Sequence, residues 1–236
     1  MALKLTIDEG NTSTKAALWD GDTIVGQQTF ADGATPEFPD ASEVIVSSVR
    51  RPSEAIEHIP ANVKPAILSC DTPLPVTICY ATPHTLGSDR IAAAAGAAAV
   101  APGRNVLIAD IGTAATYDFV TADRCFEGGN IAPGVEMRLN ALHNYTAALP
   151  AVISDGPAPL IGKTTEEAMR SGAIRGIAAE IEYYFNRFRD LTSEPVIILT
   201  GGSAETVAGY ISSPFIIEPD LVMIGLKSIL DYNENN

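Results

Sequence analysis

The sequence predicts an α/β protein made of two related halves, each with a mixed sheet flanked by helices. Apolar runs of strand length alternate with helical segments from residue 44 onward, which is typical of an α/β sheet. An apolar strand that runs into Asp-x-Gly also occurs twice, at Leu3–Gly10 and at Val106–Gly112. Because the second copy begins near the midpoint of the 236 residues, we predict subdomains at 1–103 and 104–236.

The first copy, Ile7–Lys15, has the pattern of a strand, a tight turn and a returning strand. Gly10 and Asn11 readily take positive φ, so we expect them to reverse the chain and leave amides and hydroxyls facing one concavity. Such a concavity suits phosphate. Asp8 could hold a hydrated Mg²⁺ ion, and Lys15 could meet phosphate oxygens as a point charge. Small donors between them come from Asn11, Thr12 and Ser13.

An isolated Asp-x-Gly-Asn-Thr is more often an ordinary hairpin with polar turn residues. The second copy changes this interpretation, because Asp110-Ile111-Gly112-Thr113 again follows an apolar strand. Two such hairpins imply two related halves with one phosphate-binding turn in each.

Composition limits the possible partners and compartments. The net charge of −14 and the pI near 4.5 argue against nucleic acid, which needs clustered Lys and Arg. Cys70, Cys79 and Cys125 have no CxxC or His-spaced partner, so we predict neither a disulfide nor a zinc site. With no apolar leader at the start and only strand-length apolar runs elsewhere, we expect a soluble, cytoplasmic protein without a membrane segment.

The first half is expected to begin with a three-stranded meander, since Lys15–Trp19 and Thr23–Phe30 continue from the first hairpin. After a loop, the pattern predicts a buried strand at 44–49, a short helix from Ser53 to His58 and a strand at 66–68, followed by an alanine-rich helix over 91–100.

That alanine-rich helix opens at Gly87-Ser88-Asp89-Arg90, and we predict Ser88 as its N-cap. Asp89 then lies in the first turn, where it could simply complement the helix dipole. A functional interpretation is favoured because Gly87 permits close approach and the alanines would pack the helix tightly, holding Asp89 rigidly.

In the second half, the glycine-rich stretch 126–134 is expected to be a loop, followed by an amphipathic helix over 135–149. Thr164 or Thr165 caps a long helix to about Phe188, and Gly172 and Gly176 suggest a close helix contact. The strand at 196–200 runs into Gly201-Gly202, where an adenosine could lie against bare backbone. The remaining predictions are a strand at 215–217, a helix over 221–230 and a disordered polar tail; the three histidines, His58, His84 and His143, are expected not to be ligands.

Six motifs in order make the combination specific. They are Asp8-x-Gly-Asn-Thr-x-x-Lys15, Tyr80 with Leu86-Gly-Ser-Asp-Arg90, Asp110-x-Gly-Thr-Ala114, Gly129-x-Ile-x-Pro-Gly134, Gly162-Lys-x-Thr165 and Thr200-Gly-Gly202. In this the sequence resembles the type III pantothenate kinases, within the actin-like ATPase and sugar-kinase superfamily. The resemblance implies two actin-like, ribonuclease H-like subdomains with the active site in the cleft between them. It also implies ATP-dependent phosphorylation of pantothenate to 4′-phosphopantothenate, the first step of coenzyme A synthesis.

The resemblance further implies roles for individual residues. The cradle for ATP and Mg²⁺ would be formed by Asp8, Gly10, Asn11, Thr12 and Lys15, with Thr113 from the other half. Pantothenate would contact Tyr80, Gly87, Ser88, Asp89, Arg90 and Thr165. Asp89 would accept the proton of the substrate hydroxyl, and Asp110 would hold a monovalent cation, K⁺ or NH₄⁺. Arg90 either meets the substrate carboxylate or pairs with Asp89, and a homodimer is implied, with a pocket completed by the neighbouring chain. The alternatives are another actin-like small-molecule kinase or phosphatase, and a non-catalytic regulatory relative.

Overall fold

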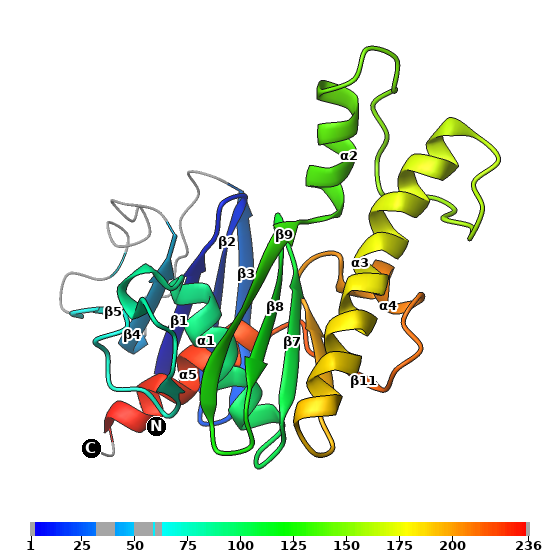
Figure 1. Ribbon diagram of the computed structural model, residues 1–236. Helices are drawn as coiled ribbons and strands as arrows, with labels where there is room; N and C mark the ends of the chain where they lie inside the picture. The colour runs from blue at the N-terminus through cyan, green and yellow to red at the C-terminus, as the bar shows by residue number, and fades with distance from the viewer. Residues whose placement is uncertain (1–2, 32–40, 50–58, 60–62, 235–236) are drawn as a thin grey trace. The chain divides into compact units, whose positions relative to one another are not determined.

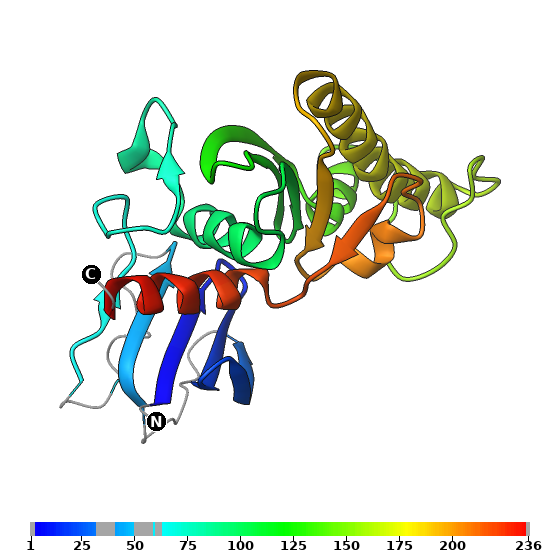
Figure 2. The same cartoon turned by 90° about the horizontal axis from the view of Figure 1, so that it is seen from below.

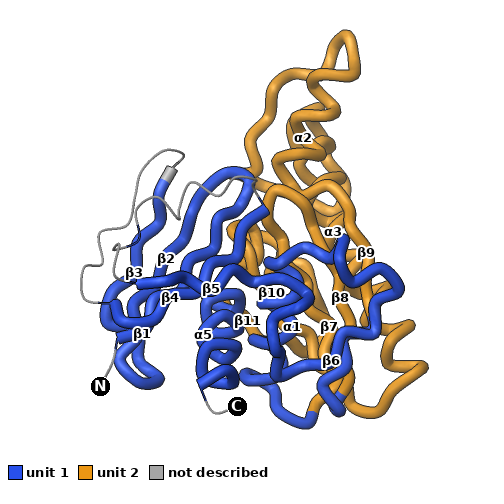
Figure 3. Tube along the Cα trace, turned by 90° about the vertical axis from the view of Figure 1, so that its left-hand side faces the viewer, with its two compact units in different colours: residues 1–103, 122–127, 220–236 blue, residues 104–121, 128–219 orange. Residues whose placement is uncertain are grey.

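The computed structural model describes residues 3–31, 41–49, 59 and 63–234. The chain divides into two compact units (Figure 3). Unit 1 comprises residues 1–103, 122–127 and 220–236, and unit 2 comprises residues 104–121 and 128–219. The predicted subdomains are two continuous segments, 1–103 and 104–236. The units are instead defined by contacts within the fold, so residues 220–236, with the last helix, belong to the same unit as the first half. The short helix expected from Ser53 to His58 lies outside the described residues.

Unit 1 contains a five-stranded mixed sheet in the order β3-β2-β1-β4-β5 (Figure 1). Its strands are β1 (Leu3–Glu9), β2 (Ser13–Asp20), β3 (Thr23–Ala31), β4 (Ala41–Ser48) and β5 (Ala66–Ile67). The first three form the predicted antiparallel meander, while β4 runs parallel to β1. The period-two alternation of β1 buries Leu5 and Ile7 on one face, and Thr6 accepts a 3.0 Å hydrogen bond from Trp19 Nε1 on the other.

Two helices of unit 1 pack on its sheet, α1 (Ser88–Val100) and α5 (Leu221–Glu234) (Figure 2). The helices approach each other closely, because a Cβ at Gly96 would overlap Leu221 O and a Cβ at Gly225 would overlap Ala92 O. The alanines of α1 are therefore buried small residues that admit a neighbouring helix, as the sequence predicts.

The tail beyond residue 230 is helical to Glu234, so the prediction of a disordered tail from Asp231 is wrong. Lysines hold this end of α5. Lys4 Nζ donates to Asp231 at 2.8 Å, and Lys227 Nζ donates to Asp231 at 2.6 Å and to Asp22 at 2.6 Å. Asp231, one of the polar residues that suggest disorder, thus belongs to an ion-pair network between α5 and the meander.

Unit 2 repeats the strand order of unit 1. Five strands of a six-stranded sheet run β9-β8-β7-β10-β11, with β7 and β8 antiparallel and β7, β10 and β11 parallel; the sixth, β6, follows β9. The strands are β7 (Val106–Ile111), β8 (Ala114–Val120), β9 (Cys125–Pro133), β10 (Val196–Thr200) and β11 (Phe215–Ile217). The internal repeat seen in the sequence is therefore a repeat of topology.

The glycine-rich stretch 126–134 is the strand β9 and not a loop, so that prediction is wrong. Its glycines permit close strand contact, since a Cβ at Gly129 would overlap Asp118 Oδ1 and Tyr117 O. The start of β9 pairs in parallel with β6 (Thr77–Ile78) within unit 1.

The helices of unit 2 are α2 (Val135–Asn144), α3 (Thr165–Leu191) and α4 (Ala204–Ala208). Thr164 is the N-cap of α3, and it forms a capping box with Glu167. A stripe of buried side chains then faces the sheet, made of Ile174, Ile177, Ile181, Phe185 and Phe188. Helix α2 ends at Asn144 rather than at Leu149.

The expected close helix contact at the glycines of α3 is absent among the described residues. A Cβ at Gly172 would meet no heavy atom within 4 Å, and one at Gly176 would meet only the Arg138 side chain. Arg138 instead joins α2 to α3 through Glu180, at 2.7 Å, and Glu180 also accepts a 2.7 Å hydrogen bond from Tyr117 Oη.

Cys79 and Cys125 form a disulfide, which overturns the expectation of none. The pairing of β6 with β9 brings them together, because Cys79 N donates to Phe126 O at 2.9 Å. A two-residue strand leaves no periodic signal in the sequence, so this pairing could not be anticipated. None of the described helices combines the length and apolar character that crossing a membrane requires.

Candidate active site

The carboxyl of Asp8 is the centre of the site in unit 1. Asp8 lies near the end of β1, where its backbone registers with Lys15 on β2 and Ser47 on β4. Its Oδ1 atom is buried and has no hydrogen-bond partner in the described part of the chain. A buried carboxyl oxygen without a donor is costly, so an incoming cation would satisfy it.

The electrostatics of Asp8 point the same way. Burial, and after it the nearby charge of Asp89, raise the pKa of Asp8 to about 6. The hydrogen bond with Ser47 and the charge of Lys15 act in the opposite direction, and Glu9 adds to the repulsion. A site with two neighbouring carboxylates and one lysine fits a hydrated divalent ion such as Mg²⁺.

The turn between β1 and β2 reverses without positive φ at Gly10 or Asn11, contrary to the expectation. Gly10 N instead donates to Ser13 O at 3.0 Å, and a Cβ at Gly10 would come within 3.2 Å of that oxygen. The glycine is thus needed for close approach and not for a left-handed conformation. Asn11 and Thr12 are exposed at the tip of the turn.

Asp89 is held at the first turn of α1. Its Oδ1 accepts a 2.8 Å hydrogen bond from Arg90 N. The residue before the helix, Gly87, leaves the space that this carboxylate occupies, because a Cβ there would overlap Asp89 Oδ1. Gly87 is the N-cap, so the prediction of Ser88 in that role is wrong.

Ser88 has a different role, tying the start of α1 to the end of β4. Its hydroxyl donates to Ser48 O at 3.2 Å and lies 3.1 Å from Ser47 Oγ. Since Ser47 also contacts Asp8, short side chains connect the Asp8 carboxyl to Ser88, the residue that precedes Asp89.

Arg90 is buried against two aromatic rings, and only 7% of it is exposed. Its Cζ lies 5.7 Å from the centroid of the Tyr80 ring and 5.6 Å from that of Phe126, within cation–π range. The two rings meet edge to face at 6.1 Å. Phe126 was not predicted as a site residue, because only the β6–β9 pairing brings it here.

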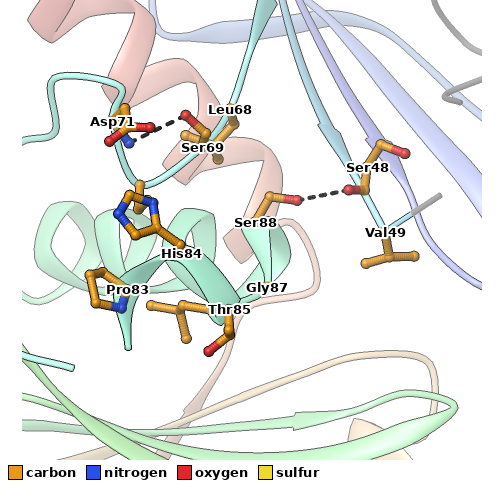
Figure 4. A pocket seen from close by; sticks show the side chains of 12 residues that line it. Ser48, Val49, Leu68, Ser69, Asp71, Pro83, His84, Thr85, Gly87 and Ser88 are labelled. Atoms are coloured by element: carbon orange, nitrogen blue, oxygen red, sulfur yellow. Dashed lines mark hydrogen bonds between the residues drawn. The ribbon is translucent and has the colours of Figure 1, made fainter. Parts of the chain in front are cut away.

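A pocket of about 590 Å³ opens at the start of α1 in unit 1 (Figure 4). One wall is the start of α1 with Gly87 and Ser88, and Ser48 and Val49 at the end of β4 form another. The remaining lining comes from residues 68–71 and from the short 3₁₀ helix η2 (Pro83–Thr85), with Leu86. Its size suits a small-molecule ligand.

Unit 2 carries the second Asp-x-Gly hairpin. Asp110 lies near the end of β7, and Thr113 is exposed in the turn to β8. Two glycines support this turn. Gly134 N donates to Thr113 O at 3.1 Å, and Gly201, at φ 87°, packs so closely on Asp110 Oδ1 that a Cβ would overlap it.

The predicted site residues therefore gather in two groups. Unit 1 brings together Asp8, Lys15, Tyr80 and Gly87–Arg90, and unit 2 brings Asp110 and Thr113 together beside Gly201. Thr165 belongs to unit 2, where it is exposed as the first residue of α3.

These features define a class of protein. Two sheets of the same strand order, each with an Asp-x-Gly hairpin after its first strand, are the arrangement of the actin-like ATPases and sugar kinases. Solved structures show the same fold. A Baf family transcriptional-activator candidate from Campylobacter jejuni matches with a TM-score of 0.65 and 20% identity over 98% of this chain and 100% of that one. A 2-dehydro-3-deoxygalactonokinase candidate from Sinorhizobium meliloti matches with a TM-score of 0.61 and 11% identity over 98% and 99%.

The chain belongs to the type III pantothenate kinase family, to which residues 4–187 match. A type III pantothenate kinase from Cytophaga hutchinsonii is 37% identical over 98% of this chain and 100% of its own length. One from Porphyromonas gingivalis strain W83 is 38% identical over 99% and 100%. The fold class and the family predicted from the six motifs are thereby confirmed.

Proposed function

We propose that this protein transfers the γ-phosphoryl group of ATP to the primary hydroxyl of pantothenate, giving 4′-phosphopantothenate for coenzyme A synthesis. Membership of the family supports the reaction. The observation that carries it to this chain is the buried Oδ1 of Asp8, which has no hydrogen-bond partner within the described ranges and lies near the charge of Asp89. The Asp8 carboxylate suits a metal ion, and the Asp89 carboxylate can then act on the substrate hydroxyl.

The nucleotide side of the site is assigned to the first hairpin. Asp8 would hold Mg²⁺, which when bound neutralises charge on the phosphates of ATP. Lys15 adds a second positive charge from β2, and Gly10 allows the backbone to approach the phosphates. The exposed Asn11 and Thr12 supply donors, and Thr113 contributes from the second hairpin.

The acceptor side is assigned to the start of α1. Asp89 orients the hydroxyl of pantothenate and takes its proton as the phosphoryl group is transferred. Its position is set by the amide of Arg90 and by the space above Gly87. Tyr80, Ser88 and Arg90 contact the rest of the substrate. Phosphoryl transfer depends mainly on alignment and charge neutralisation, so a strongly basic carboxylate is not needed.

Three further assignments belong to this proposal. Asp110 binds a monovalent cation, K⁺ or NH₄⁺, next to the phosphates, where a carboxylate oxygen is a hard ligand. The chain acts as a homodimer in the cytoplasm, with Thr165 completing the pantothenate pocket of the neighbouring chain. If Asp110 has this role, rates in K⁺ or NH₄⁺ exceed those in Na⁺ at equal ionic strength; equal rates remove it from that role.

A coupled assay of ADP release tests the function, with pantothenate compared with a panel of sugars and other small alcohols. We expect ADP release with pantothenate as the acceptor and with no other acceptor of the panel. Turnover with a sugar and none with pantothenate would make the protein another actin-like kinase, and no turnover with any acceptor would support a regulatory relative.

A further inference from the structure

Three metal-binding side chains meet on one wall of the unit 1 pocket, and the kinase reaction uses none of them. They are Cys70, Asp71 and His84. Cys70 Sγ lies 3.0 Å from His84 Nδ1, and one ligand atom from each of the three residues lies within 4.8 Å of the others. Figure 4 shows Asp71 and His84 on the same side of the pocket, across from Ser48 and Val49.

Two small turns hold these side chains in place. Residues 69–72 form a turn in which Thr72 N donates to Ser69 O at 3.2 Å, and Asp71 N donates to Ser69 Oγ at 3.3 Å. His84 lies in η2, where Leu86 N donates to Pro83 O at 3.1 Å. Because both turns are already ordered by local hydrogen bonds, binding an ion between them costs the chain little conformational entropy.

The chemistry of the three donors selects the ion. A thiolate, an imidazole and a carboxylate together suit Zn²⁺, whereas Mg²⁺ and Ca²⁺ prefer oxygen ligands alone. Around a tetrahedral Zn²⁺ the sulfur and nitrogen ligands lie roughly 3.5 Å apart, given Zn–S and Zn–N bonds of about 2.3 and 2.0 Å. The observed sulfur–nitrogen distance is 3.0 Å and the ligand atoms all lie within 4.8 Å of one another, so small rotations of the side chains suffice to close the site.

We propose that Cys70, Asp71 and His84 bind one Zn²⁺ ion, with the fourth position open to the pocket. Cys70 contributes a thiolate from a half-buried position, while Asp71 and His84 close the site from the exposed side. The ion joins the 69–72 turn to η2, whose last residue, Thr85, precedes Gly87 by two positions. None of the three ligands takes part in the proposed phosphoryl transfer, so metal binding can be measured without the kinase assay.

The sequence does not reveal this site because its spacing matches no zinc motif. Cys70 and Asp71 are adjacent, and His84 follows on a separate turn with a segment between them that includes β6. The expectations of no zinc site and no histidine ligand rest on that spacing alone. Only the folded chain brings the three side chains together.

Titration of the metal-free full-length chain with Co²⁺, in buffer without thiol reductant, provides the test. We expect a thiolate-to-cobalt charge-transfer band in the near ultraviolet and intense visible bands that saturate at one ion per chain, with Zn²⁺ displacing Co²⁺. Cys70→Ser should abolish the charge-transfer band. His84→Gln should weaken binding by more than about 100-fold, since loss of even an outer-shell partner can cost 10- to 100-fold.

Two controls make the result specific. His143→Gln changes the exposed histidine of unit 2 and should leave the titration unchanged. The double variant Cys79→Ser and Cys125→Ser removes the disulfide that lies beside Glu127, so no thiolate can form there even if the disulfide is reduced, and this variant should also bind Co²⁺ normally. Circular dichroism establishes that each variant is folded, and Asp71→Asn is a second ligand variant should Cys70→Ser unfold. The proposal is overturned if wild type shows no charge-transfer band, or if the band survives Cys70→Ser and is lost in the double variant.

Discussion

The space above Gly87 can be tested by adding a single methyl group. In Gly87→Ala the three atoms nearest to the new Cβ all belong to the carboxyl group of Asp89. That carboxylate must move by about 1 Å to restore ordinary van der Waals separation. The backbone itself tolerates alanine, because Gly87 has φ −60° and ψ 138°.

The expected loss is in turnover and not in stability. Alanine at an N-cap costs about 1 kcal/mol relative to a good cap, and the reduced freedom of the unfolded chain returns about 0.4–1 kcal/mol. The net change in the free energy of unfolding is therefore small. A catalytic group displaced by about 1 Å can cost about 100-fold in rate, so kcat for pantothenate phosphorylation should fall by about that factor.

Steady-state kinetics and thermal melts on the same samples provide the measurement. Gly209→Ala is the matched control, because Gly209 has nearly the same φ, −62°, and its added Cβ meets nothing within 4 Å. It should keep wild-type kcat. A Gly87→Ala enzyme with wild-type turnover would refute the reasoning, and so would a loss of activity that merely follows a loss of fold.

Three other predictions use different parts of the molecule. Asp89→Asn should lower turnover by about 100- to 10,000-fold while ATP affinity stays near normal, because the amide cannot accept a proton; retention of more than about a tenth of the turnover would show that Asp89 is not the base. Burial alone raises the pKa of Glu182, but hydrogen bonds from the Ser213 hydroxyl and from the Ser213 and Ser212 amides outweigh it and lower the pKa below 4.5. Because the pKa of Glu182 is lower in the folded than in the unfolded protein, its carboxylate stabilises the fold above the unfolded-state pKa, and this stability is lost as the pH falls through the folded-state pKa. Wild type should therefore lose more free energy of unfolding than Glu182→Gln on acidification below about pH 4.5. Chemical denaturation at each pH measures this, and an equal loss in the two proteins would contradict it. Finally, inactive Asp89→Asn and Thr165→Val chains, co-expressed, should recover about a quarter of wild-type activity, since roughly half the dimers are mixed and each has one intact pocket; no recovery in verified heterodimers places the action of Thr165 within its own chain.

Local patterns in the sequence predict much of this fold correctly. The β1–β2 and β7–β8 hairpins follow from apolar alternation ending in Asp-x-Gly, and α3 follows from a capping box and a regular apolar stripe. Each of these signals lies within one continuous segment of the chain, so no tertiary information is needed.

The features that the sequence does not reveal depend on residues far apart in the chain. Gly128 and Gly129 look like a loop, but the neighbouring strand leaves no room for a Cβ at Gly129, and Gly128 has a φ of 125°. The Cys79–Cys125 disulfide and the packing of Phe126 on Arg90 both depend on the pairing of β6 with β9. At the site, the motifs predict Asp8 and Asp89 by resemblance, but only the fold shows that Asp8 Oδ1 is buried without a hydrogen-bond partner among the described residues.

The packing of α1 on α5 has a consequence for how the protein is made. Helix α1 carries Asp89, and the surface it packs on is supplied by residues 221–234, at the other end of the chain. During synthesis, the ribosome releases the partner of α1 only after all of unit 2 has been translated. Unit 2 can therefore complete its core first, whereas unit 1 closes late through a contact of long sequence separation. A premature stop before residue 221 would leave unit 2 complete and remove the helix on which α1, and with it Asp89, packs.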